Sequence, residues 1–179
     1  MAKSSFKREF SAGGLVYKYQ RGKVVWLIGK HSGYHKWVLP KGLIEKGERG
    51  FETAVREVEE EMGVKVGLLS ERPIHRVQYV YWADLKKPDE GYDYEQSDEV
   101  KPRRRVAKYQ EAGGGKIKVF KVVSFFLMEY ESGDVKDHDW EMEEAVWLPY
   151  EEAMERLAFE GEREALRQAH DRIAKRLDW

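Results

Sequence analysis

Residues 42–63 constrain the fold of this chain more than any other stretch of its sequence. Within residues 51–62 the apolar side chains recur at the helical period, and five of them fall inside roughly a 100° arc of a helix. Gly63 follows directly, and glycine commonly ends a helix because it adopts the left-handed conformation without strain. The pattern predicts an amphipathic helix with one face in a hydrophobic core.

Three glutamates share one edge of this predicted helix. With Glu57 at 0°, the helical period places Glu60 at about 300° and Glu61 at about 40°. Carboxylates this close repel one another unless a cation lies among them, and an all-oxygen site suits Mg²⁺ or Mn²⁺. Mg²⁺ takes further ligands from water and phosphates, so this interpretation implies a phosphorylated substrate. Glutamate is also an excellent helix former, so the alternative is a merely solvated helix face.

Two neighbouring residues fit the metal-site interpretation. Arg56 precedes Glu60 by four positions, so an ion pair could hold that carboxylate toward the metal, which is an orienting role. Gly42 has no Cβ, so its backbone carbonyl could approach a metal closely.

The spacing of these residues resembles the signature of the Nudix hydrolase family. That signature consists of Gly, five residues, Glu, seven residues, Arg-Glu, an aliphatic residue, any residue, Glu-Glu, any residue, Gly and an aliphatic residue. The chain matches it throughout with Gly42, Glu48, Arg56, Glu57, Val58, Glu60, Glu61, Gly63 and Val64. The resemblance implies an α/β Nudix fold, an α/β/α sandwich with a mixed central β-sheet. It also implies a metal site formed by the three helix glutamates and the Gly42 carbonyl.

The chemistry that follows is attack of water on phosphorus, assisted by Mg²⁺ or Mn²⁺. Glu57 is the first candidate for the carboxylate that takes the proton of the water. Some Nudix branches use a glutamate from a late loop instead, and Glu141 lies six residues before Trp147, where that acid often occurs. A surface charge without a catalytic role is the alternative interpretation of Glu141.

Strand-like and helix-like patterns alternate along the remainder of the chain. We expect a β-hairpin at residues 15–28, further strands at 64–69, 74–82, 116–130 and 145–148, and a loop without regular structure at 31–48. Helices are expected at 150–177, broken near Gly161. We expect a single domain over residues 1–179, with a polar hairpin insertion at 84–115.

The substrate is suggested by the residues around the signature. Residues 37–42 and 11–14 resemble the diadenosine polyphosphate hydrolase branch, where Lys41 would contact a phosphate. Tyr79 and Tyr81 are candidate adenine contacts, although alternate strand positions make any one aromatic residue a packing candidate. The basic cluster in the insertion is either a solvated loop or a contact to a long phosphate chain. It consists of Arg103, Arg104 and Arg105.

We therefore expect a metal-dependent phosphoanhydride hydrolase whose small phosphorylated substrate is a dinucleoside polyphosphate. The alternatives are an inositol pyrophosphate, a nucleoside triphosphate, a triphosphorylated or capped RNA end, and a non-catalytic nucleotide-binding module. The formal net charge is -1, so nucleic acid is an improbable general partner. The absence of cysteine, of a signal-peptide pattern and of a long apolar run favours a cytoplasmic protein without a membrane segment. The oligomeric state is open.

Overall fold

The computed structural model describes residues 6–84 and 116–177. The chain divides into two compact units. The larger comprises Phe10–Val77 and Val123–Trp179, and the smaller comprises Met1–Glu9 and Gln78–Val122. The signature residues 42–63 belong entirely to the larger unit, so the larger unit is the one that positions the predicted site.

The larger unit begins with the β-hairpin that the sequence predicts. Strand β1 (Phe6–Gln20) pairs antiparallel with β2 (Lys23–His31), and Gln20 lies opposite Lys23. The two turn residues, Arg21 and Gly22, have φ values of 51° and 75°. Positive φ at both turn positions matches the twist of the flanking strands, and this explains why so short a loop joins them.

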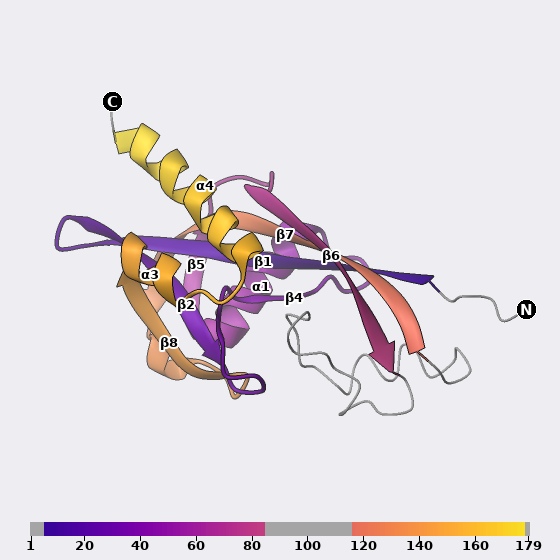
Figure 1. Ribbon diagram of the computed structural model, residues 1–179. Helices are drawn as coiled ribbons and strands as arrows, with labels where there is room; N and C mark the ends of the chain where they lie inside the picture. The colour runs from indigo at the N-terminus through magenta and orange to yellow at the C-terminus, as the bar shows by residue number, and fades with distance from the viewer. Residues whose placement is uncertain (1–5, 85–115, 178–179) are drawn as a thin grey trace, which may run out of the picture. The chain divides into compact units, whose positions relative to one another are not determined.

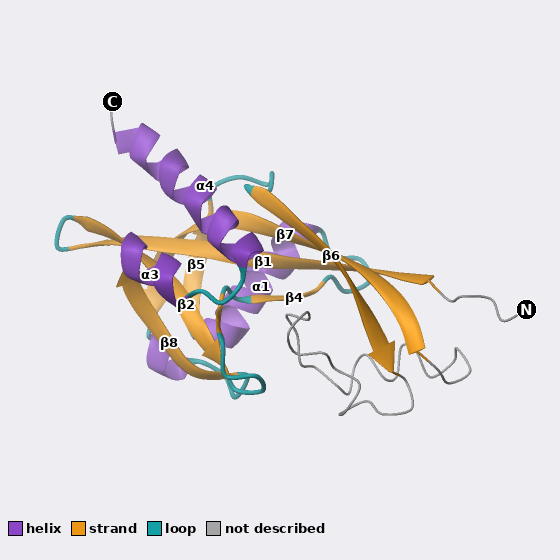
Figure 2. Ribbon diagram, viewed as in Figure 1, coloured by secondary structure: helices purple, strands orange, loops and turns teal. Residues whose placement is uncertain are grey.

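The remaining strands complete a mixed sheet in which β1 is central (Figures 1 and 2). The order is β3-β2-β1-β7-β5, with β8 also beside β2, β4 beside β1 and β6 beside β7. The β1–β4, β2–β3, β2–β8 and β5–β7 pairs are antiparallel, whereas β1 and β7 run in the same direction (Figure 1). The bounds are β3 Trp37–Val38, β4 Lys41–Leu43, β5 Val64–Leu68, β6 His75–Asp84, β7 Lys116–Gly133 and β8 Met142–Pro149.

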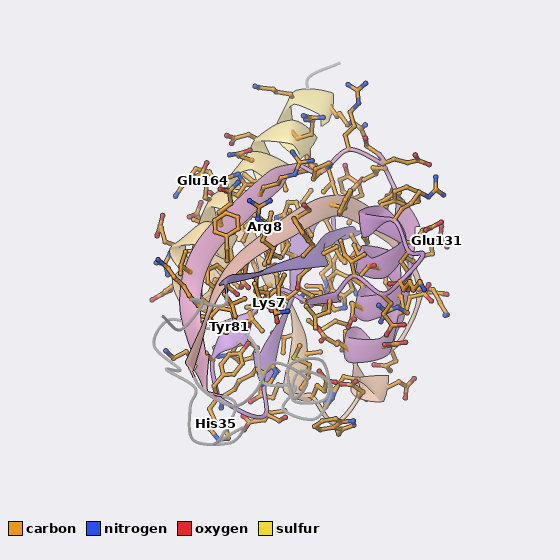
Figure 3. All side chains as sticks on the ribbon, turned by 90° about the vertical axis from the view of Figure 1, so that its right-hand side faces the viewer. Lys7, Arg8, His35, Tyr81, Glu131 and Glu164 are labelled. Atoms are coloured by element: carbon orange, nitrogen blue, oxygen red, sulfur yellow. The ribbon has the colours of Figure 1, made fainter. Side chains whose placement is uncertain are left out.

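Helices cover both faces of this sheet in the larger unit. Helix α1 (Gly50–Met62) lies on one face and α4 (Glu160–Leu177) on the other (Figures 1 and 3). A short helix, α3 (Tyr150–Arg156), and a 3-10 turn, η2 (Val135–Asp137), complete the described elements. The predicted α/β sandwich with a mixed sheet is confirmed. In the part of the chain that the structure describes, no helix combines the length and apolar composition that a membrane crossing requires.

The core lies between α1 and the sheet. Ala54, Val58 and Met62 on α1 are fully buried, as the helical period predicts. The helix approaches β1 so closely that a Cβ on Gly14 would lie 2.3 Å from Val58 Cγ2. Only glycine fits there, and this contact fixes the depth at which α1 packs on the sheet.

One sequence prediction needs correction, and the helical break predicted near Gly161 can be placed more closely. The expected loop at residues 31–48 contains β3 and β4, because residues 11–13 of β1 and residues 29–30 of β2 supply them with ladder partners. The helical break lies before Glu160, so Gly161 belongs to the first turn of α4. A Cβ on Gly161 would lie 2.6 Å from Val77 Cγ1, so this glycine permits close packing and does not break the helix.

The smaller unit contains parts of β1, β6 and β7. Within it Tyr81 is buried and its hydroxyl donates to Glu9 Oε2 at 2.9 Å. Almost all of the predicted insertion at 84–115 lies outside the described residues. The expectation of a single domain over residues 1–179 stays a prediction.

Candidate active site

Local interactions define both ends of α1 and so fix the rotation of its side chains. At the N-terminus the Arg49 N–H donates to Glu52 Oε2 at 2.8 Å, which satisfies one of the free backbone donors. At the C-terminus Gly63 has φ 70°, and its N–H donates to the Glu59 carbonyl at 3.2 Å. A Cβ on Gly63 would lie 2.5 Å from the carbonyl carbon of Asp137, so only glycine ends the helix here.

The Glu57 carboxylate lies directly against the backbone of Gly42. A Cβ on Gly42 would lie 2.0 Å from Glu57 Oε1 and 2.1 Å from Glu57 Cδ. Glu57 is only 1% exposed. Gly42 is held in place because it pairs with Ala12 in the β1–β4 ladder. The missing side chain at position 42 therefore forms a cradle for a buried carboxylate.

Glu61, one helical turn after Glu57, contacts the same strand, β4. The Lys41 N–H donates to Glu61 Oε2 at 3.1 Å, and Glu61 is 3% exposed. By contrast, the Glu60 side chain is 56% exposed. The structure thus brings two of the three predicted ligands to β4 and leaves the third on the outer side of α1.

Arg56 connects the helix glutamates to the loop before α1. Its guanidinium donates to Glu48 at 2.7 and 2.9 Å, to Glu57 Oε1 at 2.7 Å and to Glu60 Oε2 at 3.3 Å. The hydrogen bonds from Arg56 are the main reason that the pKa of Glu48 is lowered to about 2. Bonding to Glu48 likewise raises the pKa of Arg56. Arg56 has the geometry of an orienting residue, and the sequence had already suggested its pairing with Glu60.

The donor set fits a hard divalent cation. Two buried carboxylates and the Gly42 backbone supply oxygen atoms, and no thiolate or imidazole among the described residues is grouped with them. Within residues 6–84 and 116–177, no three acidic or histidine side chains gather closely enough to hold an ion by themselves. An ion held by Glu57, Glu61 and Gly42 would complete its coordination with water and substrate phosphates. Mg²⁺ commonly binds to proteins in this way, with few protein ligands.

Lys41 does not lie where the sequence suggested. Its ammonium is 2.9 Å from Glu162 Oε1 on α4, and its side chain is 3% exposed. Because α4 and α1 cover opposite faces of the sheet, this ammonium points away from Glu57 and Glu61. The physical cause is that successive side chains of a strand point to opposite faces of the sheet: a Cβ on Gly42 would point at Glu57, so the side chain of Lys41 points to the other face.

Glu141 lies in the turn before β8. It is buried, its N–H donates to Asp139 Oδ1 at 2.9 Å, and its carbonyl accepts from the Ser32 N–H at 2.8 Å. These contacts connect the turn to the loop after β2. A catalytic role for Glu141 stays a prediction.

The candidate substrate contacts divide into two groups. Tyr79 and Tyr81 belong to the smaller unit, with ring centroids 6.2 Å apart, and the burial of Tyr81 fits the packing interpretation. The three arginines of the basic cluster, Arg103, Arg104 and Arg105, lie outside the described residues. Adenine and phosphate contacts by these five side chains stay predictions.

Two site residues were given no role by the sequence reasoning. Glu48 is a fixed position of the signature, and its spacing to Arg56 was the signal that could have suggested the pair. Glu162 had no such signal, because the residues that it contacts, Leu39 and Lys41, are more than a hundred positions away in the chain.

Comparisons with known proteins place this fold and site in one family. A NUDIX domain profile matches residues 7–169. A Mycobacterium tuberculosis protein that bears the name mutator protein MutT4 is 32% identical over 173 residues, covering 93% of this chain and 56% of that protein. The asymmetrical bis(5'-nucleosyl)-tetraphosphatase of Sus scrofa is 39% identical over 62 residues, covering 34% of this chain and 42% of that protein.

The fold of this chain is also found in a solved structure, and the two can be superposed over nearly the whole of both chains. The C. elegans Ap4A hydrolase in a binary complex has a TM-score of 0.64 and 20% identity, covering 93% of this chain and 98% of that chain. The chain therefore belongs to the NUDIX family. It spans about half the length of the curated relatives it matches, 56% of one and 42% of the other.

Proposed function

We propose that this protein hydrolyses a phosphoanhydride bond in a dinucleoside polyphosphate and that it requires Mg²⁺. The observation that carries the proposal is the pair of buried carboxylates, Glu57 and Glu61, packed against the glycine cradle and the Lys41 N–H of β4. Buried carboxylates are stable only with compensating charge or hydrogen bonds, and a divalent cation supplies that compensation while it attracts phosphate.

The chain's own residues have distinct proposed roles. Glu57, Glu61 and the Gly42 carbonyl would hold the cation, and Glu60, which shares the Arg56 guanidinium with Glu57, would join them from the exposed side of α1. The bound cation would neutralise charge on the phosphate oxygens. Glu57 is our candidate to take the proton of the attacking water. Arg56 would hold Glu57 in place through its 2.7 Å hydrogen bond, so that the carboxylate oxygen that accepts the proton has a fixed position.

The choice of substrate rests on the relatives. Three curated relatives bear the name bis(5'-nucleosyl)-tetraphosphatase, and each matches the chain over a short segment. The much longer match is to a protein named as a mutator protein, a name that specifies no substrate. Nucleoside triphosphates are our second candidate substrates, because their phosphoanhydride bonds could be cut at the same metal site. The two candidates differ in product, because a dinucleoside polyphosphate yields two nucleotides and a triphosphate yields a monophosphate and pyrophosphate.

Hydrolysis of purified protein should be followed by mass spectrometry with Mg²⁺ and, separately, with EDTA. The substrates are diadenosine tetraphosphate, nucleoside triphosphates, inositol pyrophosphates and triphosphorylated RNA. Reactions in ¹⁸O-water locate the phosphorus that is attacked. We expect the highest kcat/KM for diadenosine tetraphosphate and no turnover in EDTA.

A matched pair of variants tests the site itself. Glu57→Gln should lower kcat by at least about a hundredfold, because it removes a proton acceptor and a metal ligand. Glu59→Gln is the control, since Glu59 is on the same helix but pairs with Lys65 at 2.5 Å. Equal activity of the two variants would contradict the proposed site, and turnover in EDTA would contradict the metal requirement.

A further inference from the structure

A glutamate outside the signature holds the strand that carries Gly42. Glu162, on α4, accepts the Leu39 N–H at Oε2 over 2.9 Å, and its Oε1 lies 2.9 Å from the Lys41 ammonium. The Lys41 and Glu162 side chains are 3% and 2% exposed. Charges buried to this degree are stable only when they are paired and hydrogen-bonded, so this contact has a well-defined geometry.

Residues 39–41 are thus held from both faces of the sheet. On the α1 face Glu61 accepts the Lys41 N–H at 3.1 Å, and on the α4 face Glu162 binds the residues on either side of Pro40. In the plane of the sheet the Pro40 carbonyl accepts the Gly14 N–H at 3.1 Å. Gly42 follows this segment directly, so its position against Glu57 depends on these contacts.

We propose that Glu162 is a positioning residue for the active site: by fixing residues 39–41 it places the Gly42 backbone and the Lys41 N–H against Glu57 and Glu61, and thereby sets the affinity for divalent cation. The inference rests on the proposed function for the metal-binding part. It also gives Lys41 a different role, in which its charge locks the strand to α4 instead of contacting a phosphate.

Two double variants isolate the positioning contact without leaving a buried charge. Lys41→Met with Glu162→Gln keeps an oxygen that can accept the Leu39 N–H. Lys41→Met with Glu162→Ala removes that acceptor. Both lack the ion pair, and replacing a buried ion pair by neutral groups is often tolerated, so both should fold. Glu164→Gln is the control on the outer side of α4 (Figure 3).

Two readouts without substrate are needed. The first is amide hydrogen exchange at residue 41 by NMR, and the second is the Kd for Mn²⁺ measured from the EPR signal of the free ion. The Ala double variant should exchange the residue 41 amide, which donates to Glu61, about tenfold faster than the Gln double variant. Its Kd for Mn²⁺ should be about tenfold higher, since residues that orient metal ligands typically contribute that much. Glu164→Gln should match the unmodified protein in both.

The outcomes separate this inference from the proposed function. Equal exchange at residue 41 and equal Kd in the two double variants overturn the positioning role, even if the unmodified protein binds Mn²⁺. A difference in exchange together with no Mn²⁺ binding by the unmodified protein supports the positioning of the strand and overturns the proposed metal site. A difference in both readouts supports both.

Discussion

Gly42→Ala tests whether the cradle for Glu57 matters for catalysis. The added Cβ would lie 2.0 Å from Glu57 Oε1, 2.1 Å from Cδ and 2.5 Å from Oε2. Non-bonded heavy atoms in favourable contact are about 3.5 Å apart, so the carboxylate must move by about 1.5 Å. All three clashing atoms are at the end of a flexible side chain, so the carboxylate can swing away while the strand and helix stay in place.

The magnitude follows from that movement. A displacement of about 1 Å at a reacting centre can lower a rate by about a hundredfold, which corresponds to about 2.7 kcal/mol of activation free energy. The Glu57 carboxylate also leaves its 2.7 Å bond to Arg56. For the free energy of unfolding we expect a smaller loss of about 1–2 kcal/mol, since overpacking is partly relieved by rotation of the side chain.

The assay compares Gly42→Ala with Gly50→Ala in diadenosine tetraphosphate hydrolysis, Mn²⁺ binding and urea unfolding. A Cβ on Gly50 would have Phe126 Cζ, at 3.4 Å, as its nearest neighbour, so the same substitution is sterically tolerated at the first residue of α1. Gly50→Ala should keep full activity and gain up to about 1 kcal/mol in stability. A folded Gly42→Ala protein with kcat and Mn²⁺ affinity within threefold of the unmodified protein would refute the reasoning.

Three further predictions follow from the ion pairs and burial. Arg56→Lys replaces the two hydrogen bonds that the guanidinium donates to Glu48 by a single point charge, so the free energy of unfolding in urea should fall by about 1–3 kcal/mol and kcat should also fall. An unchanged unfolding midpoint would argue against the orienting role of Arg56. Because the pKa of Glu48 is lowered to about 2, its stabilising effect is present above about pH 4.5 and lost as the pH falls toward 2. For this partly exposed pair we expect a loss of about 1 kcal/mol in acid unfolding curves, and Glu48→Gln should abolish that component. Tyr81→Phe removes the hydroxyl that donates to Glu9, so the Tm should fall while KM stays within twofold. A large rise in KM with unchanged Tm would instead show that the Tyr81 hydroxyl contacts the substrate.

The local elements of this fold could be predicted from the sequence. The 3.6-residue period places Ala54, Val58 and Met62 in the core, and the structure buries all three. The hairpin follows from two strand-like runs on either side of Gly22, and Gly63 ends α1 as expected. The period also aligned the acids on one helix edge, but it could not give their burial, and Glu60 turned out to be exposed.

The strands β3 and β4 illustrate what local patterns miss. Strand β4 has three residues and contains Gly42, so its own sequence has no strand preference. It forms because residues 11–13 of β1 pair with it and because glycine at position 13 leaves room, where a Cβ would lie 2.4 Å from the Pro40 carbonyl oxygen. Because residues 11–13 and 41–43 are distant in the sequence, no local pattern predicts that they pair.

By itself the sequence determined the family signature, the helix that presents its acids and the class of chemistry that those acids favour, because these depend on spacings along a single helix and its flanking turns. The tertiary structure decided which acids meet β4, and it directed the Lys41 ammonium to Glu162 instead of toward a phosphate. The physical reason is that these contacts join residues distant in the chain, and no period links them. They depend on which face of the sheet each side chain occupies and on the requirement that buried charges be paired.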